Sequence, residues 1–212
     1  MPYPDKTAKQ APRTTPARAT VAIAFVRGML AGMQHAGQDT APLLERANIA
    51  PSLLSDPTAR VPVDRYASLY NLINHQLDDE GFGLFSAPMR VGSFEFLCRA
   101  GITAPTLAEV IERSVRFLRL LLPDLAVTLA SNSEQALLRI SETRPLPIGR
   151  VFAFEWLLRL VHGLLSWLVG RNIVLDSVAF PYPRPAHAED YALIFTARST
   201  FDAEALTASF AA

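Results

Sequence analysis

Residues 152–170 constrain the fold of this chain more than any other feature of the sequence. The stretch is apolar on nearly all sides and contains both tryptophans. A helix that is apolar all round must be covered by protein, lipid or ligand. Its length is about that of a membrane span. However, Glu155, Arg159 and His162 lie inside it, and each charge at a bilayer centre costs roughly 2.5–3.5 kcal/mol. We therefore predict a buried helix of a soluble protein with no membrane partner.

The composition favours one substantial domain without a nucleic-acid-binding surface of its own. The chain has 212 residues, half of them apolar, which is enough for a sizeable core. Four basic residues and one acidic residue lie in the first 19 positions, which leaves 16 basic and 19 acidic residues, a net charge of −3, in the rest of the chain. Because phosphate binding needs clustered Lys and Arg, any contact with DNA is expected from elsewhere.

The reactive side chains indicate neither an enzyme nor a metal site. Cys98 is the single cysteine, which excludes an internal disulfide and fits the reducing cytoplasm. It falls on the apolar side of its predicted helix, where a small buried hydrophobe is expected rather than a nucleophile. No histidine pairs with another ligand at a metal-binding spacing. No phosphate-binding or nucleophile motif is present, so we expect no cofactor and no catalysis.

The order of predicted elements places the chain in the α+β class. Residues 1–19 are rich in proline and polar residues and are predicted to be a disordered tail. Hydrophobic periodicity and end signals predict helices at 20–35, with Thr20 as the cap, and at 42–47, 51–55, 64–77, 93–101, 106–122, 147–169 and 187–195. Strands are predicted at 125–130, 135–141, 173–180, 198–201 and 206–210. The hairpin at 125–141 favours an antiparallel sheet.

The helix at 106–122 carries three arginines, Arg113, Arg116 and Arg119, that resemble an anion clamp, but their spacing favours a solvated face. Arg113 and Arg116 each follow a glutamate at i, i+4, namely Glu109 and Glu112, and such pairs stabilise a helix by a few tenths of a kcal/mol. At the start of this helix, Thr106 and Glu109 have the spacing of a reciprocal capping box.

A narrow polar stripe runs along the apolar helix. Glu155, Arg159, His162 and Ser166 follow a 4, 3, 4 spacing and share one face. One interpretation is a solvent-facing side on which Glu155 and Arg159 form a surface ion pair. The other is the border of an internal cavity, where a few polar groups orient a ligand among apolar walls.

Several segments, in this order, resemble the N-terminal effector domain of AraC-type transcription regulators, in the arabinose-binding-like rather than the cupin-type subfamily. They are LLERANI (43–49), RVPVDRYASLY (60–70), GSFEFLCRAGITAPTLAEVIERSVRFLRLLL (92–122), FEWLLRLVHGLLSWLVGRNI (154–173), VAFPYPRPAHAEDY (178–191) and IFTARSTFDAEALTASFAA (194–212).

The resemblance implies a cytoplasmic transcription factor domain that senses a small-molecule effector and forms a homodimer. It implies an N-terminal helical part packed on a small antiparallel sheet with two long helices. In the family, promoter DNA is bound by a C-terminal helix-turn-helix domain, which is absent from this chain. The expected organisation is therefore a tail at 1–19 and a sensing and dimerisation domain at 20–212.

We expect the effector in an apolar cavity between the N-terminal helices and the sheet with its helices. The candidate lining residues are Tyr66, Phe94, Cys98, Trp156, Arg159 and His162. Aromatic walls with an arginine suit a small organic acid. Two alternatives stay open at this point: an oligomerisation module without a ligand, in which the apolar helix pairs with its symmetry mate, and a small-molecule enzyme.

Overall fold

The N-terminal part of the fold is mostly helical. The computed structural model describes residues 19–211, so nearly all of the predicted tail lies outside the described residues. Helices α1 (Ile23–His35) and α2 (Ala41–Arg46) are followed by a 3-10 turn, η1 (Pro51–Ser55), and by helix α3 (Val63–Leu77). Strands β1 (Thr20–Ala22) and β2 (Arg60–Pro62) form a small antiparallel sheet beside them.

The start of α1 differs from the prediction that Thr20 caps a helix. Thr20 begins β1, and the helix begins only at Ile23. The reason is pairing with a distant segment, since Val21 lies opposite Val61 in the ladder. β-branched residues suit such short strands, and the pattern of α1 alone does not reveal a strand partner some 40 positions away.

The second part contains the larger sheet and the long helices. Helices α4 (Ser93–Ile102) and α5 (Leu107–Leu121) precede the hairpin of β3 (Leu125–Ser131) and β4 (Gln135–Glu142). Helix α6 (Arg150–Leu168) follows, and then β5 (Leu175–Ala179), the turn η2 (Ala188–Asp190), α7 (Tyr191–Ile194), β6 (Ser199–Thr200) and β7 (Leu206–Ala211). The strand order is β3-β4-β7-β5-β6. The mixed α+β class is thus confirmed.

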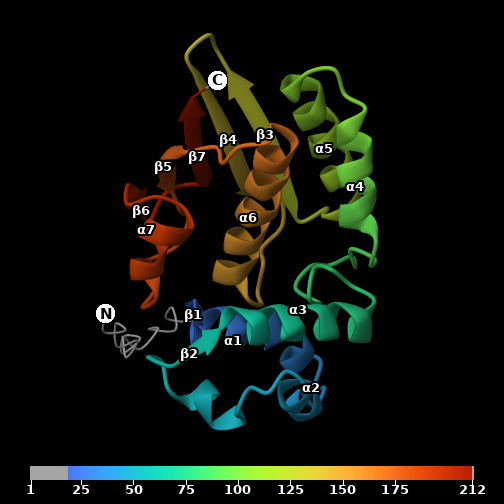
Figure 1. Cartoon of the computed structure of the whole chain (residues 1–212), viewed down its shortest axis with the longest axis vertical. Helices are drawn as coiled ribbons and strands as arrows, with labels where there is room; N and C mark the ends of the chain where they lie inside the picture. The colour runs from blue at the N-terminus through green and yellow to red at the C-terminus, as the bar shows by residue number, and fades with distance from the viewer. Residues whose placement is uncertain (1–18, 212) are drawn as a thin grey trace, which may run out of the picture.

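The sequence predicts a purely antiparallel sheet, and the structure shows that this is wrong for one pair of strands. Strands β5 and β6 pair in parallel through Val178 with Ser199 and Ala179 with Thr200, while the other pairs are antiparallel. The connection through η2 and α7 makes this possible, because parallel neighbours need a crossover. Figure 1 shows α6 in front of the strands, α4 and α5 on one side of it, α7 on the other, and α1 and α3 across its lower end.

Helix α6 is the central helix of the fold, and the protein itself covers it. It is long and apolar enough to cross a membrane by length and composition alone, but 67% of the relevant window is buried inside the protein. Near its N-terminal end, α1 approaches it so closely that a Cβ on Gly28 would overlap the side chain of Phe152. Trp167, by contrast, is 57% exposed. Most of the helix is therefore a core element of this chain, whereas its C-terminal end at Trp167 stays exposed.

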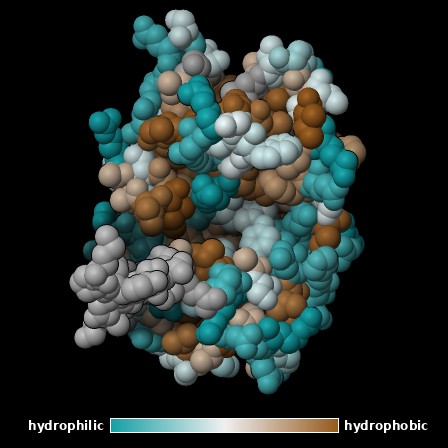
Figure 2. Space-filling model, viewed as in Figure 1, coloured by the Kyte–Doolittle hydropathy of each residue, from teal (hydrophilic) through white to brown (hydrophobic). Residues whose placement is uncertain are grey.

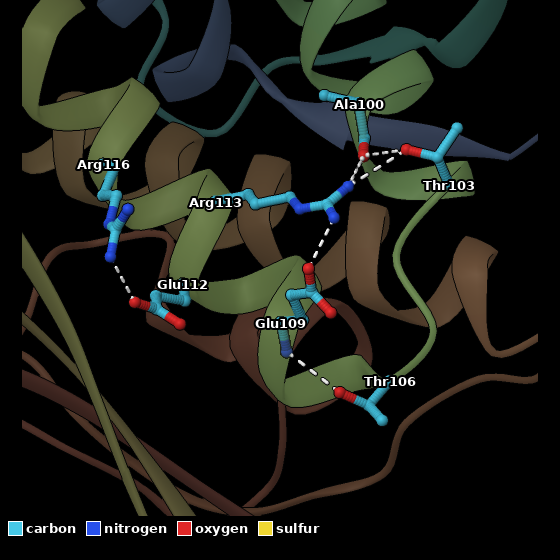
Figure 3. Close-up of polar contacts among 7 residues, drawn as sticks. All are labelled: Ala100, Thr103, Thr106, Glu109, Glu112, Arg113 and Arg116. Atoms are coloured by element: carbon cyan, nitrogen blue, oxygen red, sulfur yellow. Dashed lines mark hydrogen bonds and ion pairs between the residues drawn. The ribbon is translucent and has the colours of Figure 1, made fainter.

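The polar face of α5 carries the two predicted ion pairs, each with an N–O distance of 2.5 Å (Figure 3). Arg113 has a further structural role, because Nη1 also donates to the carbonyl oxygen of Ala100 and to Thr103 Oγ1 at the end of α4. The capping box is only half formed. The hydroxyl of Thr106 accepts from the backbone N–H of Glu109, but the Glu109 carboxylate binds Arg113 and does not return to Thr106.

Candidate functional site

A cavity of about 480 Å³ opens between the two parts of the fold. Strand β1 with α1 and α3 forms one side, and α4, α6 and α7 form the other. Figure 2 shows this face of the molecule hollowed between the lower helices and the region of α6. The lining is mainly apolar and aromatic: Val21, Phe25, Tyr66, Tyr70, Phe94, Phe152, Glu155, Trp156, Arg159, Leu160, Leu193 and Ile194. Concave, mostly apolar sites with a few polar groups are typical of small-molecule binding.

The structure brings four of the six predicted site residues together in the lining of this cavity. They are Tyr66 of α3, Phe94 of α4, and Trp156 and Arg159 of α6. Helix α5 and strands β3 and β4 lie between α4 and α6 in the sequence, so only the tertiary fold brings these residues together.

Cys98 and His162 do not line the cavity. Cys98 lies one helical turn beyond Phe94 and packs against the core, and burial raises the pKa of its thiol. A raised thiol pKa keeps the sulfur protonated, which fits the small-hydrophobe interpretation. Helical spacing correctly placed Cys98 on the same face as Phe94. It could not show that the cavity ends before it reaches Cys98.

His162 instead fixes the connection that follows α6. Its Nε2 lies 2.7 Å from the carbonyl oxygen of Ile173, and since a carbonyl only accepts, Nε2 is the donor. Burial lowers the pKa of His162, so the neutral imidazole is favoured. The backbone N–H of Ile173 donates to Ser166 Oγ at 3.2 Å. The second half of the polar stripe therefore holds the chain entering β5.

Trp156 forms a fixed aromatic wall of the cavity. Its indole Nε1 donates to the hydroxyl of Tyr70 at 3.1 Å. Its ring also packs edge-on against Phe82, with centroids 6.0 Å apart, and lies 5.7 Å from the ring of Phe85. The side chain is only 6% exposed. Buried aromatic side chains with a satisfied N–H are rigid lining elements.

Glu155 is the main polar group of the cavity that sequence reasoning did not place among the site residues. It is 3% exposed, and its Oε1 accepts from the hydroxyl of Tyr191 and lies 2.5 Å from Nε2 of His187. The Tyr182 hydroxyl lies 3.0 Å from that of Tyr191. Burial and the nearby charge of Glu155 raise the pKa of Tyr191, so its hydroxyl stays a protonated donor. The partners follow Glu155 by more than 30 residues, which no local pattern signals.

Arg159 does not form the ion pair with Glu155 that one interpretation of the stripe predicted. Its side chain is exposed, and Nη1 lies 3.5 Å from Nδ1 of His162, a long contact. No carboxylate of residues 19–211 forms a salt bridge with it. The guanidinium is therefore a cation at the cavity whose hydrogen-bonding capacity the described part of the protein leaves mostly unused.

Tyr66 completes the polar part of the lining. Burial is the main cause that raises the pKa of its hydroxyl, the negative charge of Glu155 adds to this effect, and the positive charge of Arg159 opposes it. The hydroxyl is thus a neutral donor within electrostatic reach of both charged groups. Among the described residues, no cluster of three or more His, Cys, Asp or Glu side chains could hold a metal ion.

The fold thus places a mainly apolar cavity with a few polar side chains between the N-terminal helical part and the sheet part. Residues 37–212 match the family described as the arabinose-binding domain of AraC transcription regulators, N-terminal. The match covers most of the chain, which therefore belongs to this family. The chain is a regulatory sensing domain of a transcription regulator and not an enzyme.

A curated relative supports the same assignment. The chain is 26% identical over 183 residues to the ornithine utilization regulator of Pseudomonas aeruginosa. The aligned region covers 86% of this chain and 54% of the relative, so the chain spans about half the length of that protein.

Proposed function

We propose that the cavity between α1, α3 and α6 is the effector site of this regulator and that its effector is a small organic acid. The observation that carries the proposal is the position of Arg159, a guanidinium at the edge of an apolar cavity without a carboxylate partner among residues 19–211. Arginine binds carboxylates through charge-assisted hydrogen bonds, often in a bidentate manner. The apolar walls would enclose the body of the acid.

Effector occupancy would be communicated through the elements on the two sides of the cavity. The N-terminal helical part supplies β1, α1 and α3, and the sheet part supplies α6 and α7. The two parts are already linked outside the cavity lining, because Asp190 lies 2.9 Å from Arg60 and accepts from the backbone N–H of Ala22. An effector that contacts both sides would favour one of their relative arrangements, as required for a shift in population.

The rest of the assignment follows the family. In this proposal, residues 20–212 form the sensing and dimerisation domain of a cytoplasmic regulator, and promoter DNA is bound through a C-terminal helix-turn-helix domain outside this sequence. A homodimer is supported by exposed apolar side chains after the buried part of α6, where Trp167 is 57% and Val174 is 72% exposed. A Trp167→Glu variant that stays dimeric by light scattering would argue against this surface.

Calorimetric titration of the purified chain with a panel of carboxylic acids tests the effector site. We expect at least one acid to bind, and Arg159→Gln to weaken it at least about tenfold, because a hydrogen bond to a charged group contributes about 1.5–3 kcal/mol. Arg116→Gln is the matched control, since Arg116 is exposed on α5 and remote from the cavity lining. Equal affinities of wild type and Arg159→Gln would contradict the proposal.

A further inference from the structure

Besides Arg159, the cavity contains a second polar group, formed by the Glu155 carboxylate and the Tyr66 hydroxyl. Of the two oxygens of Glu155, only Oε1 accepts the hydrogen bonds from His187 and Tyr191. The structure gives Oε2 no hydrogen bond from residues 19–211, and it is not among the fully enclosed unpaired polar atoms. The hydroxyl of Tyr66 likewise has no hydrogen bond among these residues. Because both residues line the cavity, this capacity is open to a ligand.

Glu155 and Arg159 can be compared with other Glu–Arg pairs that lie four residues apart on helices of this chain. Three other pairs have the same order and spacing: Glu95–Arg99 at 2.7 Å, and Glu109–Arg113 and Glu112–Arg116 at 2.5 Å. All three form the ion pair expected at i, i+4. Glu155 and Arg159 form no such ion pair, because Tyr191 and His187 hold the Glu155 carboxylate away from the Arg159 guanidinium. An anionic and a cationic group thus line one cavity without neutralising each other.

We infer that the cavity takes an α-amino acid with an apolar side chain, whose carboxylate binds Arg159 and whose ammonium group binds Glu155 and lies beside Tyr66. The inference rests on the proposed effector site and adds the second polar group. Residues four apart on a helix have Cβ atoms about 5–6 Å apart, so a ligand with adjacent opposite charges matches the two groups. The apolar walls, including Phe25, Phe94 and Phe152, match the side chain.

The buried carboxylate of Glu155, with one oxygen unpaired, favours an ammonium group over a neutral donor. A buried carboxylate oxygen gains most from a cationic donor, since charge-assisted hydrogen bonds are about twice as strong as neutral ones. A simple acid would leave this oxygen desolvated and unpaired when it fills the cavity, which is costly. The site therefore selects against acids that lack the amine.

The test is calorimetric titration of the 212-residue chain with L-phenylalanine, 3-phenylpropionate, L-3-phenyllactate and phenethylamine. Leucine and 4-methylpentanoate repeat the comparison with a smaller side chain. We expect the amino acid of a pair to bind at least about tenfold more tightly than its deaminated acid. Glu155→Gln should remove this preference, because the amino acid loses its anionic partner and the deaminated acid no longer leaves a charged oxygen unpaired. Should Glu155→Gln fail to fold, Tyr66→Phe, which keeps the ring, should reduce the preference.

Each outcome decides a different claim. If the deaminated acids bind as tightly as the amino acids, the inference is wrong while the proposed acid site stands. If phenyllactate equals phenylalanine, the donor is a hydroxyl and the assignment of an ammonium group is wrong. If phenethylamine binds as tightly as phenylalanine, or if none of the compounds binds, the proposed site itself fails.

Discussion

Two glycines in long helices should respond to alanine with opposite signs, because of what surrounds them. Gly28 of α1 faces Phe152 of α6, and an added Cβ would lie 2.8 Å from Cδ2 of the phenylalanine and closer still to its Cβ and Cγ. The Cβ of Phe152 cannot move away by a change of rotamer, so the helices must separate. For Gly163 of α6, an added Cβ would meet nothing within 4 Å.

The magnitudes follow from two competing effects. Alanine in place of glycine stabilises a helix interior by about 1 kcal/mol. Overpacking of a well-packed contact costs about 1–3 kcal/mol, and the fixed position of the Phe152 Cβ places Gly28 at the upper end. We therefore expect Gly28→Ala to lower the free energy of unfolding by about 2 kcal/mol and Gly163→Ala to raise it by up to about 1 kcal/mol.

Urea denaturation followed by tryptophan fluorescence measures both variants, with each free energy obtained by linear extrapolation. Because Phe152 also lines the cavity, Gly28→Ala should in addition weaken effector binding, whereas Gly163→Ala should not. If Gly28→Ala were as stable as wild type, the close packing of α1 on α6 would be wrong, and with it the geometry of the cavity wall.

Three further predictions test the surrounding contacts. Tyr70→Phe leaves the buried N–H of Trp156 without its acceptor and should lower the free energy of unfolding by about 1–2 kcal/mol in the same urea assay; no change would mean that another group accepts this bond. Arg113→Ala should cost about 1 kcal/mol through its contacts with the end of α4, and Arg116→Ala, whose ion pair is exposed, less than about 0.5 kcal/mol; equal losses would refute the structural role of Arg113. Burial lowers the pKa of His162 below its value in the unfolded chain, so the unfolded state binds more protons and the protein should lose stability as pH falls below about 6.5. This loss should be smaller in His162→Gln, and an identical pH profile for that variant would contradict the assignment.

Local patterns predicted most of the helices and the hairpin because their signals are short-range. The 3, 4 spacing of apolar residues, Thr106 at the start of α5 and the alternation in β3 and β4 are properties of adjacent positions. Strands β1 and β2 escaped prediction because each has three residues and is defined by its distant partner. The same reason explains the parallel pairing of β5 with the two-residue strand β6.

The candidate site was accessible to sequence reasoning only where a side chain could be placed on a helix face. The polar stripe of α6 pointed to Arg159, and aromatic residues on α3 and α4 pointed to Tyr66 and Phe94. Glu155 was recognised in the stripe but was not placed among the site residues. Glu155 and Arg159 line the cavity, whereas His162 and Ser166 hold the segment that leads into β5. This difference depends on the path of the chain after α6, which a helical pattern does not reveal. The role of Glu155 depends likewise on Tyr191 in a segment that contacts it only in the folded protein.

The central claim is that the cavity beside Trp156 is the effector site of this AraC-type sensing domain. In a Trp167→Phe variant, Trp156 is the single fluorophore of its kind and reports on the cavity directly. We predict that titration with an apolar amino acid changes its fluorescence in a saturable way and that Arg159→Gln abolishes or strongly weakens this response. A ligand that binds by calorimetry without any change at Trp156, or equally well to Arg159→Gln, would contradict the account.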